Sequence, residues 1–525
     1  MGIMAFFFSV LFFYIYKVTD VPIATMAPAS SLLALSGLAV STVAVLYLFP
    51  RRRQSFVESY PPGPKSPDIP TLDAWVQYQE WGREYGDLVY IHENNMLILN
   101  NAHVANDLLD KRARIYSDRA MTNMMKLCGF DDLLSTQRYS DKWRGNRSLF
   151  QQNFRKSISS RFYQAQYKQI HQFLRNLTDN PEEFMQHTML LSQGVIYASL
   201  YGLDIRSDES VAQRVGQTVH LIGRAIVEPF PAFERFSWLR FMPSWFPGCG
   251  FQKVANECLA GIKEAETIPY DRAVNNLKMG TGTSLIAELA LESEGDPVGI
   301  GRVKAMGTIS FLAGADTTMS SIASFLLTMT QHPDVQLKAQ AEIDHVIGRD
   351  RLPTFEDRQS LPYVESIYRE IMRMHPPVPV DLPHISTEDD FYRGYHIPKG
   401  CTIVANIWGI NRDPNVFSEP DTFMPERFLN SSTGPYTNIN NIYAFGFGRR
   451  VCAGRHMADN TVWLTIVSVL ATLNLRKAKD DAGNEIDIPG EYTKTFFRHP
   501  SPYRSSITPR DQQARDLILA TATAD

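Results

Sequence analysis

The stretch AFGFGRRVCAGRHMADN (residues 444–460) limits what this chain can fold into more than any other part of it. Its cysteine, Cys452, follows two glycines and two arginines and precedes a run with helical periodicity. Unpaired backbone N–H groups and the positive dipole end of a helix stabilise a thiolate at such a place. A thiolate suits iron, whereas an isolated cysteine is usually a small buried residue. A zinc pair with His456 lacks two further ligands at suitable spacing.

The rest of the chain predicts one large, mainly helical domain. With 525 residues, 44% of them hydrophobic and 21% charged, the chain has the composition of a globular protein. The β-rich runs are residues 87–100, a predicted hairpin, and residues 384–407. Apolar residues at helical spacing predict helices over 302–331, 334–347, 362–374 and about 454–474. We therefore expect a mainly α (α+β) fold with a small β-sheet region.

Residues 228–248, EPFPAFERFSWLRFMPSWFPG, are dense in aromatic side chains and interrupted by prolines. The prolines argue against one long helix through this segment. Its aromatic side chains either belong to the core or rest on a lipid bilayer and line a route for an apolar ligand.

Charge and cysteine content exclude two classes of protein. The formal net charge is −4, from 52 basic and 56 acidic residues, and no dense basic stripe appears, so nucleic acid is not an expected partner. The five cysteines are odd in number, widely spaced and free of any CxxC pair. This pattern indicates a reducing compartment rather than a disulfide framework.

The N-terminus predicts a retained membrane anchor over residues 1–53. Residues 30–49 are uncharged and long enough to cross a bilayer as a helix. Arginines 51–53 follow, which places that side in the cytoplasm by the positive-inside rule. A removable signal peptide would end in small residues instead. The apolar run 3–16 is short for a span and either lies in the interface or forms a second crossing.

Two short segments are predicted to flank the globular body. Residues 54–67 include the run YPPGPKSP, whose prolines make a stiff, extended joint between the anchor and the body. Residues 511–525 are predicted to form a polar C-terminal tail.

The stretch GTISFLAGADTTMSS (residues 307–321) contains small residues at helical spacing on one face. Taken alone, such a stripe usually means that another helix packs closely against it. Asp316 and Thr317 add a polar step to a helix that is otherwise apolar enough to be buried. The Thr317 hydroxyl can bond back to a carbonyl of the preceding turn and open the helix slightly.

Three other groups of residues have ordinary interpretations when taken alone. Glu370 and Arg373 lie one helical turn apart, and such a pair is usually a surface ion pair of little energetic value. Trp143 and Arg147 share one helical face and read as a surface patch. His384 reads as a surface histidine beside a hairpin.

Together, these residues resemble the motifs of the cytochrome P450 family of haem-thiolate monooxygenases. The spacing Phe445-x-x-Gly448-x-Arg450-x-Cys452-x-Gly454 matches every position of the family's cysteine-ligand loop. The resemblance implies that Cys452 is the axial thiolate ligand of haem iron. It also implies that Phe445 packs beside the thiolate and that Arg450 pairs with a haem propionate.

Residues 313–318 resemble the oxygen-activating helix of the same family, in the pattern Ala-Gly-x-Asp-Thr-Thr. By this resemblance, the face of small residues lies over the haem and leaves a slot for O2 and substrate. The Thr317 hydroxyl would steer protons to the distal oxygen, and Asp316 would relay them from solvent.

The resemblance changes the interpretation of the Glu370–Arg373 pair. Glu-x-x-Arg is the internal ion-pair motif of the family, and an arginine such as Arg427, in the segment PERF (residues 425–428), completes it. The three side chains are then expected to form a buried, mutually satisfied network that fixes the loop carrying Cys452. Their implied role is structural rather than catalytic.

Trp143 and Arg147 match the family's Trp-x-x-x-Arg, whose side chains reach the haem propionates. His384 occupies the place where family members have another propionate partner. The matches run in order from Pro61 to about residue 500. They make residues 68–510 the expected haem-thiolate catalytic domain.

The resemblance implies an enzyme that uses haem as its cofactor and inserts one oxygen atom from O2 into an apolar small molecule. The style of the motifs resembles fungal microsomal enzymes, which suggests a terpenoid substrate, with an aromatic or alkaloid metabolite as the alternative. Too few residues follow Cys452 to hold a flavin- or NADPH-binding portion. The implied electron donor is a separate, membrane-bound NADPH–cytochrome reductase that docks on the Cys452 side.

This assignment places the protein at the endoplasmic reticulum membrane with its catalytic domain in the cytosol. The N-x-S/T sequons at Asn146, Asn176 and Asn430 should then carry no glycan. Two other functions stay open: a haem-thiolate isomerase or dehydratase that acts without O2, and a haem-binding membrane protein without enzymatic activity. The intact Asp316-Thr317 pair argues against both.

The residues expected to line the substrate pocket are 121–125, Phe311, 378–382 and the TKTFF turn at 493–497. They predict an apolar, medium-sized ligand.

Overall fold

The structure, a computed structural model, describes residues 60–524 except 71, 228–229, 247 and 430–441. The predicted anchor region 1–53, with its span 30–49, lies outside the described residues. Within the part of the chain that the structure describes, no helix is both long and apolar enough to traverse a bilayer. Residues from Pro61 onward belong to one structural unit.

The described end of the proline-rich joint lies along the first strand, β1 (Leu88–Ile91). The Tyr90 N–H donates to the carbonyl oxygen of Pro62 at 3.0 Å. A Cβ on Gly63 would lie 2.1 Å from the carbonyl oxygen of Tyr90, so this approach requires glycine. From Pro61 onward the joint is therefore fixed to the body at the edge of the sheet.

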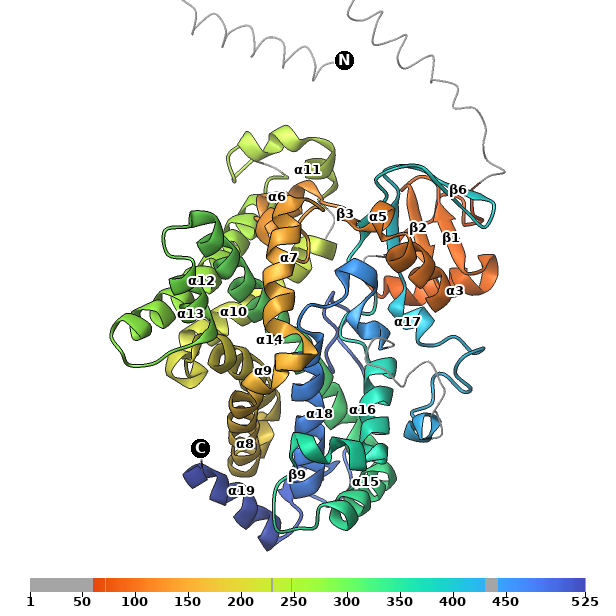
Figure 1. Ribbon diagram of the computed structural model, residues 1–525. Helices are drawn as coiled ribbons and strands as arrows, with labels where there is room; N and C mark the ends of the chain where they lie inside the picture. The colour runs from red at the N-terminus through yellow and green to blue at the C-terminus, as the bar shows by residue number, and fades with distance from the viewer. Residues whose placement is uncertain (1–59, 71, 228–229, 247, 430–441, 525) are drawn as a thin grey trace, which may run out of the picture. The chain divides into compact units, whose positions relative to one another are not determined.

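Helices make up most of the described chain (Figure 1). The helices are α3 (Ala74–Tyr85), α4 (Ala102–Ala105), α5 (Ala113–Tyr116), α6 (Asn123–Leu127), α7 (Asp141–Phe154), α8 (Tyr163–Asp179), α9 (Phe184–Tyr201), α10 (Glu209–Val227), α11 (Pro231–Arg235), α12 (Phe251–Lys278), α13 (Leu285–Glu292), α14 (Pro297–Gln331), α15 (Pro333–Val346), α16 (Pro362–Met374), α17 (Ile407–Ile410), α18 (Arg455–Thr472) and α19 (Gln512–Ala524).

The predicted helices are confirmed, with small changes at their ends. α16 has the predicted bounds, and α15 and α18 differ by one or two residues from theirs. α14 begins five residues earlier than predicted, at Pro297 rather than residue 302. The Asp296 side chain accepts a hydrogen bond from the Val298 N–H at 3.0 Å, and proline suits the first position of a helix. The Asp296 cap and Pro297 therefore define where α14 begins.

The strands form three small sheets. The largest has the order β1-β2-β7-β4-β3 and joins both β-rich regions of the sequence. The predicted hairpin over residues 87–100 is confirmed, with Leu88 opposite Leu99 and Ile91 opposite Met96. The other strands are β2 (Met96–Leu99), β3 (Asp118–Arg119), β4 (His384–Ile385), β5 (Asp390–Tyr392), β6 (Tyr395–Ile397), β7 (Thr402–Ala405), β8 (Leu473–Lys477) and β9 (Ser505–Pro509), with β5 paired to β6 and β8 to β9.

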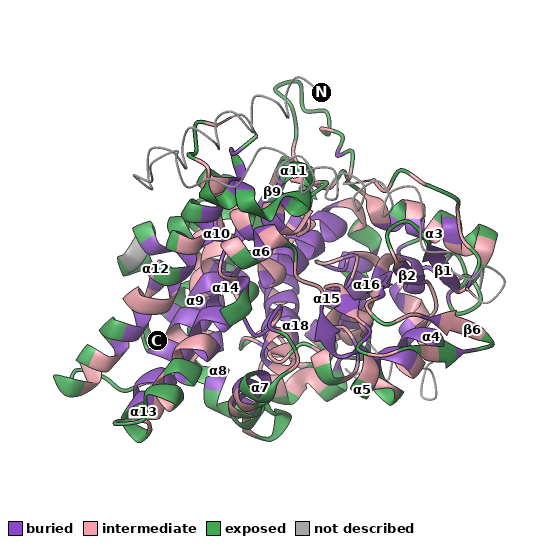
Figure 2. Cartoon of the chain, turned by 90° about the horizontal axis from the view of Figure 1, so that it is seen from above, coloured by how far each residue is buried: buried purple, intermediate pink, exposed green. Residues whose placement is uncertain are grey.

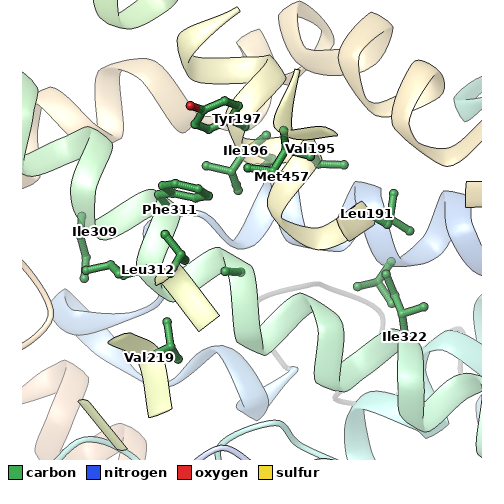
Figure 3. Packing of buried hydrophobic residues seen from close by; sticks show 14 of the residues in the cluster. Leu191, Val195, Ile196, Tyr197, Val219, Ile309, Phe311, Leu312, Ile322 and Met457 are labelled. Atoms are coloured by element: carbon green, nitrogen blue, oxygen red, sulfur yellow. The ribbon is translucent and has the colours of Figure 1, made fainter. Parts of the chain in front are cut away.

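α14 runs through the middle of the helical region, and buried residues concentrate on it and on α9, α16 and α18 (Figures 1 and 2). Figure 3 shows this core from close by, with Phe311 of α14 next to Ile196 and Tyr197 of α9. A Cβ on Gly314 would lie 3.0 Å from the side chain of Ile196. The small residues of α14 therefore allow α9 to pack closely, as the stripe predicts.

The aromatic segment 228–248 contains no long helix in its described residues, which confirms the effect of its prolines. α11 and a short 3₁₀ helix, Ser237–Phe241, are its only regular elements there. Trp245 and Phe241 are 79% and 75% exposed, whereas Phe233 is buried. The segment is thus divided between core and surface.

The segment predicted as a polar C-terminal tail, residues 511–525, contains a helix that packs on the body. α19 occupies Gln512–Ala524 and packs against α8, and its Ile518 is fully buried. The Ala514 N–H donates to the Asp511 carboxylate at 3.0 Å, and Arg349 pairs with the same carboxylate. The apolar residues of this segment recur at helical spacing among polar ones, a signal that its overall polarity conceals.

Candidate active site

One cavity of about 330 Å³ lies between the loop of Cys452 and the central helix α14. Cys452 and Phe445 line it from the loop, and Ala313, Gly314 and Thr317 line it from α14. A volume of this size is typical of a small-molecule site. Aliphatic and aromatic side chains supply most of the remaining wall, among them Val195, Ile196, Val219, Ile222, Phe496 and Phe497.

Backbone contacts hold the Cys452 loop in place. The Cys452 N–H donates to the carbonyl oxygen of Phe445 at 2.8 Å. Gly448 has a φ of +54°, and a Cβ there would lie 2.1 Å from the carbonyl oxygen of Leu109. Both the dihedral angle and the space therefore require glycine at this position. Gly446 also has a positive φ, +78°, but its missing Cβ would point into open space.

Cys452 is exposed only in the sense that its side chain faces the cavity. Burial raises the pKa of the Cys452 thiol, while the Gly454 N–H and the guanidinium groups of Arg147 and Arg455 act in the opposite direction. The thiol is therefore neutral near pH 7 in the chain by itself. A metal cation at the sulfur would deprotonate it.

Three guanidinium groups, those of Arg119, Arg147 and Arg450, line the cavity. Burial lowers the pKa of each of them. Arg147 donates through Nη2 to the carbonyl oxygen of Val451 at 2.7 Å, but its Nε is buried without a hydrogen-bond partner among the described residues. An anion bound in the cavity would stabilise these charges and satisfy the unpaired donor.

Arg450 and Trp143 stack on one another and are both bonded to backbone carbonyl groups. The guanidinium carbon lies 4.2 Å from the centroid of the indole. Arg450 donates to Ser117 and Gln137, each at 2.8 Å, and Trp143 Nε1 donates to Leu134 at 3.2 Å. Both side chains line the cavity. A propionate would have to replace the Leu134 carbonyl at the single N–H of Trp143, whereas Arg450 uses only three of its five N–H groups for carbonyl acceptors.

His384 lines the cavity from β4, with an acceptor at each ring nitrogen. Its Nδ1 lies 2.6 Å from the carbonyl oxygen of Tyr116 and its Nε2 lies 3.2 Å from the Asp381 carboxylate. Burial and the charge of Arg119 lower the pKa of His384, and Asp381 raises it. A neutral imidazole has a single N–H, so His384 donates to only one of these two acceptors.

Sequence reasoning missed Arg119 in this wall, and it included Asp381 only as one position of the predicted pocket stretch 378–382. Their side chains lie 3.8 Å apart, and both are nearly inaccessible to solvent. Neither belongs to a motif with fixed spacing, and a lone charged residue usually indicates a surface. Their proximity arises from the pairing of β3 with β4, two strands far apart in the sequence.

Thr317 of α14 lines the cavity. Side-chain hydroxyl groups donate hydrogen bonds to the backbone carbonyl groups of the preceding helical turn. Thr317 Oγ1 donates to the carbonyl oxygen of Ala313 at 2.8 Å. Ser192 of α9 donates to the carbonyl oxygen of Gly314 at 2.9 Å and also bonds that of Ala315. Ser192 lines the same cavity, and no sequence signal identified it.

Asp316 lies on another face of α14, and it is not among the described residues that line the cavity. Its Oδ2 lies 2.9 Å from Nε2 of His499. The sequence places Asp316 next to Thr317 but does not identify His499 as a functional residue. A single histidine between prolines belongs to no motif that would assign it a role.

The structure brings Glu370, Arg373 and Arg427 together in one buried network. Arg373 donates to both oxygens of the Glu370 carboxylate, at 2.7 and 2.8 Å, and Arg427 donates to Oε1 at 3.0 Å. The Met424 N–H adds a fourth bond at 2.9 Å. The carboxylate is fully inaccessible to solvent, so the network satisfies a charge that would otherwise be costly to bury.

The expected pocket residues are only partly those of the cavity. Val378, Leu382, Phe496 and Phe497 line it, as predicted. Phe311 is fully buried beside Tyr197, with ring centroids 5.3 Å apart, and packs into the core (Figure 3). None of residues 121–125 lines the cavity within the described chain. Both wrong assignments concern apolar residues, for which the sequence does not separate cavity wall from core.

The family model for cytochrome P450 matches residues 72–506. The chain belongs to the cytochrome P450 family. It is 34% identical over 503 residues to cytochrome P450 monooxygenase 208 of Postia placenta, covering 92% of this chain and 97% of that protein. It is 36% identical over 517 residues to cytochrome P450 monooxygenase COX1 of Coprinopsis cinerea, covering 93% and 98%. It is therefore a cytochrome P450 monooxygenase.

The fold is that of the P450 family. A structure of a zebra fish cytochrome P450 with progesterone superimposes with a TM-score of 0.68 and 21% identity, covering 84% of this chain and 100% of that one. The mainly helical P450 fold with small sheets, predicted from the sequence, is thus confirmed.

The cofactor of P450 enzymes is haem, and the cavity of this P450 fits it. Haem carries two carboxylates and an iron that needs an axial ligand. The three cavity arginines offer cations for the carboxylates, and the unpaired Nε of Arg147 is a donor without a protein acceptor among the described residues. The Cys452 side chain faces the same space.

Proposed function

We propose that this P450 inserts one oxygen atom from O2 into a terpenoid, with Cys452 as the residue whose thiolate would hold the haem iron. The observation that carries the proposal is that Cys452, from its loop, and Thr317, from α14, line one largely apolar cavity. Haem ligated by a thiolate supplies the O2 chemistry in such a site. The chain supplies the ligand, the substrate cavity and the path of protons.

The residues of the cavity divide these tasks. Arg147 and Arg450 would bind the propionates of the haem, and the ring of Trp143 stacks on the guanidinium group of Arg450. Phe445 lines the cavity from the same loop and would pack beside the sulfur. Thr317 exchanges its bond to the Ala313 carbonyl for one into the cavity, which lets its hydroxyl pass a proton onward. Asp316 takes protons from solvent and supplies them to this hydroxyl.

Replacement of Cys452 by alanine tests the ligand. The reduced, CO-bound protein is expected to show the strongly red-shifted Soret band of a haem thiolate, and Cys452→Ala is expected to lose that band because alanine offers no ligand. The difference spectrum of purified full-length protein measures this. Cys401→Ala is the matched control, since Cys401 is a buried cysteine whose thiol pKa is raised by burial to about 12 and which does not line the cavity in the described structure. A red-shifted band retained in Cys452→Ala would contradict the assignment.

The proposed terpenoid class is supported by the wall of the cavity. Branched aliphatic side chains from α9 and α10 face Phe496 and Phe497 around the space above α14. Such a wall selects an apolar, compact molecule mainly by burial of hydrocarbon surface. A panel of terpenes, aromatic compounds and alkaloids, incubated with protein, NADPH and reductase, would distinguish the classes by product mass. Turnover confined to aromatic compounds or alkaloids would overturn this part of the proposal.

We assign the electron supply to a separate NADPH–cytochrome reductase that docks on the Cys452 side. Exposed basic residues support this docking face: Arg449 of the loop bonds the Tyr139 hydroxyl at 2.9 Å, and Lys142 and Arg144 follow on α7. The turnover assay above requires reductase if this assignment is right. Its omission should abolish product formation.

The proposed location is the endoplasmic reticulum membrane, with the catalytic domain in the cytosol. The uncharged run 30–49 and the exposed aromatic residues of segment 228–248 support it. Phe236, Trp238, Phe241 and Trp245 are all exposed, and Arg240 lies 4.6 Å from the Phe241 ring. Aromatic residues with a neighbouring cation are typical of the membrane interface.

Quenching by brominated lipid tests this contact. In vesicles containing the full-length protein, bromine on the acyl chains is expected to quench tryptophan fluorescence, and the double variant Trp238→Phe/Trp245→Phe should lose most of that quenching. Trp81→Phe is the control because Trp81 is buried. Equal quenching in the double variant and the parent would show that this segment does not meet the bilayer.

A further inference from the structure

His499 contacts the proton-carrying side of α14 without any role in the function described so far. Its Nε2 lies 2.9 Å from Oδ2 of Asp316, and the two side chains are 16% and 21% exposed. Asp316 precedes Thr317, which lines the cavity. The contact therefore joins a histidine near the end of the chain to the pair that handles protons.

The turn that carries His499 is fixed on both sides. The Thr493 N–H donates to the carbonyl oxygen of His499 at 2.7 Å, and the His499 N–H donates to Thr493 Oγ1 at 3.0 Å. The Ser320 hydroxyl of α14 donates to the carbonyl oxygen of Arg498. The backbone N–H of Arg498 donates to the carbonyl oxygen of Pro377 at 2.9 Å. The imidazole is thus presented to Asp316 by its backbone.

Stacking adds to this fixation. The guanidinium carbon of Arg498 lies 3.7 Å from the ring centroid of Tyr492 and 4.7 Å from that of Trp408. Lys494, the other cation of the turn, pairs with Asp73 at 3.1 Å. Both cations are therefore directed to partners other than Asp316, and among the contacts of the described residues His499 is the group that reaches its carboxylate.

The surroundings of the imidazole indicate where its proton lies. Nδ1 of His499 is buried and has no hydrogen-bond partner among the described residues. A buried N–H without an acceptor costs more than a bare ring nitrogen at the same place, because the N–H loses a strong bond to water. His499 therefore carries its proton on Nε2 and donates it to the Asp316 carboxylate.

The same turn also reaches the substrate. Phe496 and Phe497 line the cavity, while His499, two residues later, contacts Asp316 of α14. A Cβ on Gly223 of α10 would lie 3.7 Å from the ring of Phe497, so the turn packs against α10. The bond from Ser320 holds the same turn against α14. One segment thus shapes both the cavity and the environment of the acid.

We propose that His499 is a positioning residue for proton delivery in this P450. Its Nε2–H holds the Asp316 carboxyl group in register with Thr317. The Asp316 carboxylate takes a proton from solvent and gives it to the Thr317 hydroxyl, which passes its own proton into the cavity, so that Asp316 returns to the carboxylate form. His499 keeps its proton throughout, so no further donor or oxidant is needed. The inference rests on the monooxygenase function.

Two substitutions at His499 test the proposal in the full-length protein with reductase. His499→Phe keeps an aromatic ring but removes the donor, and it is expected to lower product formed per NADPH by about tenfold, with more peroxide released, because the carboxyl group is no longer held. His499→Gln retains an N–H donor and should recover most of that loss. Substrate affinity, measured by equilibrium binding, should stay within about twofold of the parent in both.

His396→Phe is the matched control. His396 pairs with Asp389 at 3.2 Å in the β5–β6 region, and it does not line the cavity in the described structure. It should leave the product yield per NADPH unchanged. If His499→Phe matches the parent in product yield, or if His499→Gln is as impaired as His499→Phe, the proposed role is wrong.

A second measurement reads the hydrogen bond without turnover. In protein labelled with ¹⁵N-histidine, the Nε2 resonance of His499, identified by its loss in His499→Gln, is expected to shift in Asp316→Asn because the charged acceptor is removed. An unchanged resonance would show that the bond does not exist in solution. Absence of product with the parent protein would instead contradict the monooxygenase function. The ¹⁵N resonance of His499 would still show whether its hydrogen bond to Asp316 exists.

Discussion

Gly448→Ala is expected to prevent stable incorporation of haem, whereas Gly446→Ala should allow it. At Gly448 the left-handed dihedral angle costs an alanine about 1–2 kcal/mol. The new Cβ would also lie 2.1 Å from the carbonyl oxygen of Leu109. A backbone oxygen cannot turn away as a flexible side chain can, so the loop itself must move. Overpacking of this kind adds about 1–3 kcal/mol.

Gly446→Ala is a close control because its φ, +78°, is also positive but no atom lies within 4 Å of the added Cβ. Among the described protein atoms, Gly446→Ala carries the dihedral cost alone, although Gly446 lines the cavity. Haem content per protein and the reduced CO spectrum measure the outcome in both variants. Equal haem content in the two variants would show that the contact with Leu109 does not set the position of the Cys452 loop.

Glu370→Gln is expected to destabilise the domain by about 3–5 kcal/mol, the usual cost of breaking a buried ion pair from one side. The glutamine is nearly the same size, so the effect comes from charge and hydrogen bonding. It leaves the guanidinium groups of Arg373 and Arg427 without their carboxylate and turns an N–H₂ donor toward other donors. The free energy of unfolding, obtained by chemical denaturation of the purified protein, measures the change.

Glu264→Gln is the control for this experiment. Glu264 and Arg214 form a two-bond pair of similar geometry, at 2.7 and 3.0 Å, on the protein surface. Solvent screens such a pair, so its loss should leave the unfolding midpoint nearly unchanged. Similar midpoints for Glu370→Gln and Glu264→Gln would contradict the importance of the buried network.

Comparison of the sequence with the structure shows which signals carry information. The Cys452 loop and the Ala313–Thr318 turn were recognisable because each side chain lies at a fixed spacing from its neighbours. Helix periodicity and proline placement gave α15, α16 and α18 to within two residues. These features are local, and the physical reasons for them act over a few residues.

The features that sequence reasoning missed depend on contacts between distant segments. Arg119 meets Asp381 only because β3 pairs with β4, and His499 meets Asp316 only because its turn is bonded to α14. Periodicity also did not decide whether the Glu370–Arg373 pair faces inward. That direction follows from the fold that surrounds α16.

The shared turn over residues 493–499 has a consequence for enzyme engineering. Phe496 and Phe497 are natural targets for laboratory evolution toward new substrates, since they line the cavity. Their backbone is continuous with that of His499, which is held by Thr493 within the same turn. Variants selected only for a new product will therefore tend to waste reducing equivalents as peroxide, and selection schemes at these two positions should monitor NADPH consumption together with product yield.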